Sequence, residues 1–296
     1  MKKKIISLIG ALFLGVLLWY LFIKPYDYLV SFKAKTFPGA INQSIKTWNK
    51  SLENRGVIDQ VDINNLTQQI TFNDSIFSYK WKINSINDST SNVKIYIKNI
   101  DHSLKNKIMI PFSNTDFEKR TKSTLVGFTE KLNEHIKKFK VDIKGESEIR
   151  STYCAYVPIK TDQLGKAKGM MDNYSLLSTH IAKNEIELNG LPFIEVMSWD
   201  MVNDSIYYNF CYPIIEKDSL APHKLISYKQ VDSKKALKAI YNGNYITSDR
   251  AWYALIDYAD KRKIQIDFKP FEIFHNNPGL SGDELNWKAE VYLPIK

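Results

Sequence analysis

Hydrophobic and polar residues follow three patterns along this chain. Residues 5–23 form an apolar run without a charged side chain. Residues 26–35, and further short segments between 59 and 100, alternate between apolar and polar positions, which is typical of half-exposed strands. Between 113 and 140 the apolar positions recur every three or four residues instead. The pattern predicts an apolar N-terminal helix, a meander of antiparallel strands and a long amphipathic helix.

The predicted long helix carries one continuous apolar face. Its members are Phe117, Thr121, Leu125, Phe128, Leu132, Ile136 and Phe139. Ser113 or Asn114 is the expected N-cap, because a side-chain oxygen there can accept from the first free backbone N–H groups. A shorter helix is expected after a Pro-Gly break, with Ile41, Ile45 and Trp48 at helical spacing.

The N-terminal run has the length and the flanks of a membrane anchor. Ile5–Ile23 is 19 residues long, which at about 1.5 Å per residue spans a hydrocarbon core of roughly 30 Å. Trp19 and Tyr20 suit a membrane interface, and the positive-inside rule places the preceding MKKK in the cytoplasm. A cleaved signal peptide is the alternative, but no small-x-small cleavage site follows the run. We expect residues 1–24 to be a single-pass transmembrane signal-anchor, with the domains on the outer (periplasmic or extracytoplasmic) side.

The order of the following elements resembles a known fold. A strand, a helix, several strands and a long C-terminal helix are expected over residues 26–142. This order is similar to the helix-grip fold of the START-like (SRPBCC, polyketide-cyclase-like) superfamily, although the sheet is one or two strands short. The resemblance implies a curved sheet around the long helix, often with an apolar cavity. We assign residues 25–145 to this domain and interpret the polar stretch DIKGESEIRS, 142–151, as the junction that ends it.

The second half of the chain contains an internal near-repeat. Each copy is expected to fold as strand, helix, strand, strand, and Pro192-Phe193 in the first copy matches Pro270-Phe271 in the second. Tyr212-Pro213 likewise corresponds to Leu293-Pro294, and matches that recur at nearly the same offset indicate a repeated structural unit. We therefore expect an α+β domain over residues 150–296, with one antiparallel sheet, helices on one face and a groove between the halves.

The second copy also carries family motifs. YNGNY…AWYALIDYADKRKI, PFEIFHNNP and the closing AEVYLPI resemble the gyrase-inhibitor-like (GyrI-like) effector-binding domain of multidrug-responsive bacterial regulators. The departures are HNNP for the usual NDP turn and Phe274 for the usual Tyr. The resemblance covers residues 150–296 and implies a small-molecule-binding domain. In that family the strand acid, here Glu272, lies at the bottom of an aromatic-walled pocket that attracts lipophilic cations.

Strand alternation gives Glu272 two possible environments. It shares a face with Phe274, while Phe271 and Ile273 share the other. If helices pack against Phe271 and Ile273, Glu272 points into the groove; the alternative is a solvent-facing acid on an open sheet. The candidate ligand-binding residues are Glu272, Phe274, Tyr245, Trp252, Trp287, Glu195 and Trp199, the last two because Phe193, Glu195, Met197 and Trp199 are expected on one strand face.

Three functions remain open at this stage. The first is a membrane-anchored protein that captures lipophilic ligands, cationic ones among them, because a cation stacked on aromatic rings relieves a buried carboxylate. The second is a hydrolase of reactive lipophiles, in which Glu272 and Tyr245 or Tyr292 would activate water. The third is a structural protein whose grooves are filled by its own side chains.

The charge distribution and the absence of known motifs limit which partners and cofactors the sequence predicts. The net charge is +9, but the lysines are scattered and no Arg-rich stripe or helix-turn-helix pattern is present, so we expect no nucleic-acid partner. The five histidines lack metal-ligand spacing, and P-loop, GxGxxG and GxSxG motifs are missing, so we expect neither metal nor cofactor. Cys154 and Cys211 lie in strand-like runs, and a disulfide and two free thiols are both compatible with them.

Overall fold

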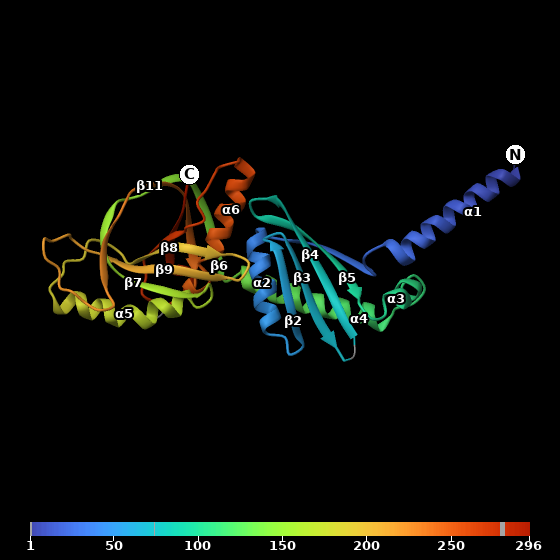
Figure 1. The fold of residues 1–296 in the computed structure, drawn as a ribbon, viewed down its shortest axis with the longest axis horizontal. Coiled ribbons are helices and arrows are strands. Elements are labelled where there is room, and N and C mark those ends of the chain that lie inside the picture. Colours follow the sequence, from blue (N-terminus) through green and yellow to red (C-terminus); the bar gives the residue numbers. More distant parts are fainter. Residues whose placement is uncertain (1, 74, 279–281) are drawn as a thin grey trace. The chain divides into compact units, whose positions relative to one another are not determined.

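The computed structural model describes residues 2–73, 75–278 and 282–296, and the chain divides into two compact units, Met1–Asn133 and Glu134–Lys296 (Figure 1). Each unit has its own antiparallel sheet. The mixed helix and strand content, the antiparallel sheets and the apolar N-terminal helix agree with the fold class expected from the sequence.

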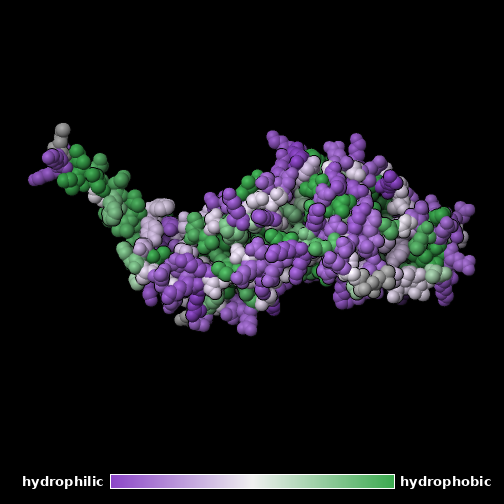
Figure 2. Space-filling model, turned by 180° about the vertical axis from the view of Figure 1, so that it is seen from behind, coloured by the Kyte–Doolittle hydropathy of each residue, from purple (hydrophilic) through white to green (hydrophobic). Residues whose placement is uncertain are grey.

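The apolar N-terminal run is helical. Helix α1 (Lys2–Leu18) continues into the short π-helix η1 (Trp19–Ile23), and together they are long and apolar enough to cross a bilayer. The side chains of Leu8 and Leu12 are 72% and 71% exposed, and apolar side chains cover this helix in Figure 2. A signal sequence has the same length and composition, so a membrane-spanning role stays a prediction.

The first unit contains a five-stranded sheet in the order β1-β5-β4-β3-β2. The strands are β1 (Tyr28–Ala34), β2 (Arg55–Asp62), β3 (Asn65–Phe72), β4 (Ser75–Asn87) and β5 (Thr90–Asn99). The alternation predicted from the sequence is clear in β4, where Phe77, Tyr79 and Trp81 are buried and Lys80 and Lys82 are exposed. One face of the sheet is therefore apolar and the other is polar.

Helices α2 (Pro38–Lys50) and α4 (Asp116–Ile136) pack on the apolar face of this sheet. The Phe128 ring of α4 lies 4.9 Å from the Trp81 ring and 5.2 Å from the Trp48 ring, measured between centroids. The apolar face predicted for the long helix is confirmed from Phe117 to Leu132. The START-like relationship itself stays a prediction.

Two details of the helical segment differ from expectation. A short helix, α3 (Ser103–Met109), precedes α4 and was not predicted. The hydroxyl of Thr115 accepts a 3.1 Å hydrogen bond from the backbone N–H of Glu118. Thr115, rather than Ser113 or Asn114, therefore caps α4, because only its oxygen reaches a free donor three residues ahead.

The second unit contains an eight-stranded antiparallel sheet in the order β10-β7-β9-β8-β12-β13-β11-β6. The strands are β6 (Phe139–Ile149), β7 (Thr152–Asp162), β8 (Phe193–Asp200), β9 (Ser205–Pro213), β10 (Ser227–Val231), β11 (Lys234–Gly243), β12 (Phe271–Phe274) and β13 (Lys288–Pro294). The order strand, helix, strand, strand occurs twice, with helices α5 (Lys166–Lys183) and α6 (Arg250–Arg262). The two halves meet where β8 pairs with β12.

Most of the polar stretch that was expected to be a domain junction is part of strand β6. Residues 142–151 were expected to link two domains, but Phe139–Ile149 forms an edge strand that pairs with β11 along its length. Its exposed positions alternate and are Lys140, Asp142, Lys144, Glu146 and Glu148. Charged side chains on an edge strand discourage pairing with other chains. The same charges make the strand resemble a linker in the sequence.

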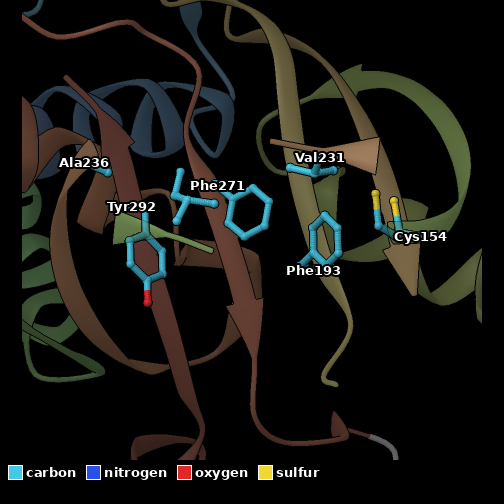
Figure 3. Packing of buried hydrophobic residues seen from close by; sticks show 8 residues of the cluster. Cys154, Phe193, Val231, Ala236, Phe271 and Tyr292 are labelled. Atoms are coloured by element: carbon cyan, nitrogen blue, oxygen red, sulfur yellow. The ribbon is translucent and has the colours of Figure 1, made fainter. Parts of the chain in front are cut away.

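The face of this sheet opposite Glu272 carries a row of buried residues with one member from each strand. They are Ile149, Cys154, Phe193, Cys211, Val231, Ala236, Phe271 and Tyr292. In Figure 3 the rings of Phe193 and Phe271 face each other across β8 and β12, and their centroids are 4.6 Å apart. Cys154 and Cys211 lie on the neighbouring strands β7 and β9 as buried free thiols, and burial raises the pKa of Cys211.

Candidate functional site

Glu272 is fully buried and is paired within the chain. The Nζ atom of Lys166 lies 2.8 Å from its Oε1 and 2.9 Å from its Oε2, and the Ser248 hydroxyl donates a 2.7 Å hydrogen bond to Oε2. All three side chains are inaccessible to solvent. The acid among aromatic residues is therefore neither a surface residue nor an unpaired buried charge, because the chain supplies its own cation.

Both partners of Glu272 lie at the N-terminal ends of helices. Lys166 is the first residue of α5, and its backbone carbonyl accepts a 2.7 Å hydrogen bond from the Tyr208 hydroxyl. A Cβ atom on the preceding Gly165 would lie 2.2 Å from Thr161 Oγ1, so a larger residue in the tight turn from β7 into α5 would force the Thr161 side chain to move. Ser248 lies just before α6, and its Oγ atom is also hydrogen bonded to Lys166 Nζ.

A buried polar network fixes the two helix starts relative to each other. Gln163, ahead of α5, donates a 2.9 Å hydrogen bond to Asp249, which also forms a 2.8 Å ion pair with Arg250 of α6. The side-chain oxygen Oε1 of Gln163 accepts from Trp199 Nε1 at 3.0 Å and from the Tyr253 hydroxyl at 3.1 Å. Fully hydrogen-bonded buried networks are rigid, so Lys166 and Ser248 are held in place beside Glu272.

Aromatic rings surround this charge pair. Lys166 Nζ lies 4.9 Å from the centroid of the Trp252 ring, and the Trp199 ring lies 5.0 Å from that of Trp252. A second group places Tyr245 4.8 Å from Phe274 and 5.8 Å from Trp287. The structure thus brings Trp252 and Trp199 close to the pair, while Tyr245, Phe274 and Trp287 form a neighbouring cluster.

The predicted residue Glu195 lies on the other face of the sheet. It is directly opposite Phe271 across β8 and β12, whereas Glu272 is opposite Ile194. Paired residues of antiparallel strands share a face, so Glu195 and Glu272 point in opposite directions. Glu195 forms an ion pair with Lys229 there. The condition under which Glu272 would point into an open groove, helices on the Phe271 and Ile273 face, is not met, since Lys166 of α5 and Ser248 ahead of α6 reach Glu272.

A β-bulge explains why Trp199 and Glu195 separate. The pairing of β8 with β9 shifts register between Val196 and Ser198, so that Trp199 pairs with Ile206. An inserted residue moves all later side chains of a strand to the other face. Trp199 therefore joins Trp252 on the helix face, contrary to the simple alternation that grouped it with Glu195.

The catalytic pairings considered from the sequence are not assembled. The Tyr245 hydroxyl donates a 2.8 Å hydrogen bond to the Lys288 carbonyl and accepts one from Asn276 N–H, and burial raises the pKa of Tyr245 to about 12. Tyr292 lies on the opposite face, where its hydroxyl donates to Glu290 at 2.8 Å. A general base must reach the proton that it removes, and the Glu272 oxygens are already bound to Lys166 and Ser248.

Sequence reasoning missed Lys166 and Ser248. One signal was available: both helices of this unit start with a basic residue, Lys166 in α5 and Arg250 in α6. A cation is unfavourable at the positive end of a helix dipole, so a buried acid is the expected partner. Among residues 2–73, 75–278 and 282–296, no group of three or more His, Cys, Asp or Glu side chains is arranged to hold a metal ion.

Comparison with known proteins identifies the second half of the chain. Residues 154–296 match the family model described as the GyrI-like small molecule binding domain. No curated protein sequence matches the chain. The match to the family model confirms the GyrI-like resemblance, and residues 26–142 lie outside the range that it covers.

The solved structures that match part of this chain are distant from it in sequence. The EcmrR C-terminal domain has a TM-score of 0.45 and 13% identity, over 53% of this chain and 98% of that chain. SAV2435 bound to tetraphenylphosphonium has a TM-score of 0.38 and 11% identity, over 52% and 94%. A hydrolase from Listeria innocua has a TM-score of 0.35 and 12% identity, over 55% and 98%.

Proposed function

We propose that residues 154–296, a GyrI-like domain, bind small lipophilic molecules, cationic ones among them, at the Glu272 site. The family match supports small-molecule binding. The preference for cations is supported by the chemistry around Glu272, where a carboxylate and aromatic rings lie together in a dry environment.

One observation carries this proposal. Lys166 Nζ lies 2.8 Å from Glu272 Oε1 and 4.9 Å from the centroid of the Trp252 ring, with all three side chains fully buried. A carboxylate beside an indole face is a site for a cation, and here the chain's own ammonium fills it. An external cation must displace Lys166, so we describe binding as an exchange of one cation for another.

The energetics of buried ion pairs make such an exchange feasible. The attraction between two buried charges is largely offset by the desolvation of both. A ligand cation at Glu272 restores the attraction, while Lys166, as the first residue of α5, can extend its ammonium towards water. The lipophilic part of the ligand then gains contact with Trp252 and Trp199.

An unpaired donor adds to the support. The Trp252 Nε1 atom is buried and has no hydrogen-bond partner among the described residues. Buried donors normally have an acceptor. A ligand with an oxygen acceptor beside its cationic group would satisfy Trp252 as well as Glu272.

Anchoring by the Lys2–Ile23 helix completes the proposal. The three lysines of MKKK lie at the N-terminal end of an apolar helix of bilayer length, which supports a cytoplasmic N-terminus and an outer location for both units. We expect the protein to remain in membranes washed with carbonate and its C-terminus to be cleaved by protease added to spheroplasts. Release of the protein by carbonate, or full protection from protease, would contradict this topology.

Ligand exchange is tested with tetraphenylphosphonium as a lipophilic cation and the full chain in nanodiscs. Isothermal titration should show saturable binding to the wild type. Lys166→Met should bind at least about tenfold more tightly, a difference of about 1.4 kcal/mol, because no internal cation competes. Lys168→Met is the matched control on the same helix, since Lys168 is 77% exposed and pairs with Asp172 at the surface.

The outcomes separate the two parts of the proposal. Equal affinities of wild type and Lys166→Met would contradict exchange at Glu272. Affinity retained in Glu272→Gln would place the ligand elsewhere in the domain. Failure of the wild type and of Lys166→Met to bind any lipophilic cation would contradict the function itself.

A further inference from the structure

A cavity in the first unit is separate from the Glu272 site. It has a volume of about 420 Å³ and lies between the β3–β4 hairpin, α3 and the start of α4. Its lining includes Phe72, Phe77, Lys105, Asn106, Phe117 and Arg120. Small-molecule pockets typically have volumes of roughly 300–1,000 Å³, so this space suits a small organic molecule.

Three phenylalanine rings form an apolar wall of the cavity. The Phe77 ring lies 4.8 Å from that of Phe72 and 4.9 Å from that of Phe117, measured between centroids. Phe77 and Phe117 also belong to the core between the sheet and α4. The wall is therefore held rigidly by the fold, and a ring or chain placed on it would be removed from water.

Asn106 contributes a buried donor without an acceptor. Its side chain is on α3 and the residue is only 7% exposed, and its Nδ2 atom has no hydrogen-bond partner among residues 2–73, 75–278 and 282–296. The backbone N–H and carbonyl of Asn106 are used within the helical turns, bonded to His102 and Ile110. The Nδ2 donor therefore remains without a partner among the described residues, and burying such a donor is costly unless an acceptor arrives.

Among the residues that the structure describes, the charged side chains that line the cavity are mostly positive. Lys105 and Arg120 are both exposed at its rim, and the Arg120 guanidinium lies 5.9 Å from the centroid of the Phe72 ring. Asp116 also lines the cavity, but its side chain is 92% exposed and is 3.7 Å from Lys119. An anion that enters beside Asn106 would therefore meet two cations.

We propose that this cavity binds a small amphipathic anion. The apolar part would lie on the phenylalanine wall, while an anionic oxygen would accept a hydrogen bond from Asn106 Nδ2 and pair with Lys105 and Arg120. Carboxylates and phosphate esters share this chemistry, and either a free small molecule or an anionic lipid headgroup can supply it. The site lies wholly within the first unit and does not depend on the function of Glu272.

The probe is 2-naphthoate, with 2-naphthylmethylammonium as its counterpart of similar shape and opposite charge. The full chain is reconstituted in phosphatidylcholine nanodiscs with saturating tetraphenylphosphonium, which occupies the Glu272 site, and is titrated calorimetrically with each. We expect the anion to bind at least about tenfold more tightly than the cation, a difference that one charge-assisted hydrogen bond supplies. Equal binding of both, or tighter binding of the cation, would overturn the proposal.

Asn106→Leu separates a ligand role from a structural one. Leucine has a similar shape and removes the unpaired donor, so the melting temperature without ligand should be unchanged or higher. Binding of 2-naphthoate should weaken at least about tenfold. A lower melting temperature with unchanged affinity would mean that Asn106 is only structural.

Rim variants keep the test valid if Asn106→Leu fails to fold. Lys105→Gln and Arg120→Gln change exposed residues, and each should weaken binding severalfold. Lys131→Gln is the control, because Lys131 is exposed on α4 and does not line the cavity. Unchanged affinity in both rim variants would overturn the proposal.

A change of the nanodisc lipid distinguishes the two possible sources of the anion. If the natural occupant is a lipid headgroup, nanodiscs that contain phosphatidylglycerol should compete with 2-naphthoate and raise its apparent Kd, and Asn106→Leu should abolish the competition. If the affinity is the same in both lipids, the occupant is a free small molecule.

Discussion

The ammonium of Lys166 lies 2.8 Å from the carboxylate of Glu272, and both side chains are completely buried. Lys166 begins α5 in the first half of the second unit, and Glu272 lies on β12 in the other half. The ion pair therefore ties the two strand-helix-strand-strand halves together at the centre of one sheet. Substitution of either partner therefore tests how much this ion pair contributes to the stability of the second unit.

Removal of one partner should be more harmful than removal of both. Glu272→Gln or Lys166→Met alone should lower the free energy of unfolding by about 3–5 kcal/mol, because a buried charge or donor loses its partner. The double variant Lys166→Met with Glu272→Leu should be more stable than either single variant. Urea denaturation followed by circular dichroism measures all three, and strictly additive losses would show that the two groups are not coupled.

Ser248 should contribute through its hydrogen bond to the carboxylate. Ser248→Ala removes the 2.7 Å bond to Glu272 Oε2 and should lower the free energy of unfolding by about 1.5–3 kcal/mol, as for hydrogen bonds to charged groups. Ser178→Ala is the control, since its hydroxyl makes only a 3.4 Å local bond, and it should stay within about 0.5 kcal/mol. Equal effects of the two changes would argue against a role for Ser248.

Acid should weaken the second unit through His135. Burial, together with the Arg250 charge, lowers the pKa of His135 to about 4, and its Nε2 accepts a 3.2 Å hydrogen bond from Arg250 Nε. The pKa of an unfolded histidine is about 6.5. Between pH 6.5 and 4 the unfolded state therefore holds the extra proton, and stability falls as the pH falls, by up to about 3 kcal/mol.

The His135 effect is checked by urea denaturation at pH 7, 5.5 and 4.5. His135→Gln should remove its share of the pH dependence, whereas His102→Gln, which changes an exposed histidine, should not. The same slope in wild type and His135→Gln would contradict the prediction.

The edge strand β6 should be needed for the second unit to fold. A fragment of residues 134–296 should give a cooperative thermal transition, because it retains the pairing of β6 with β11. A fragment that starts at residue 150 exposes the edge of β11 and should melt at a lower temperature or aggregate. Equal melting temperatures for the two fragments would show that β6 is only an appendage.

Local pattern was sufficient for most elements but not for all. Alternation predicted β4 and helical spacing predicted the buried face of α4, because each element buries one of its own faces. Strand β6 was interpreted as a linker, since its partner β11 begins at Lys234, far along the chain. Its charged alternation is common to edge strands and to linkers, and only the neighbouring strand distinguishes them.

The sequence by itself determined that Glu272 lies among aromatic residues on a strand of a small-molecule-binding domain, because alternation and family motifs are local. Only the tertiary structure decided that Lys166 is its partner, since the two residues are 106 positions apart and meet through the sheet. It also decided the directions of Glu195 and Trp199, because strand register and one bulge set the face of each side chain. Register depends on the pairing of whole strands, which no single stretch of sequence encodes.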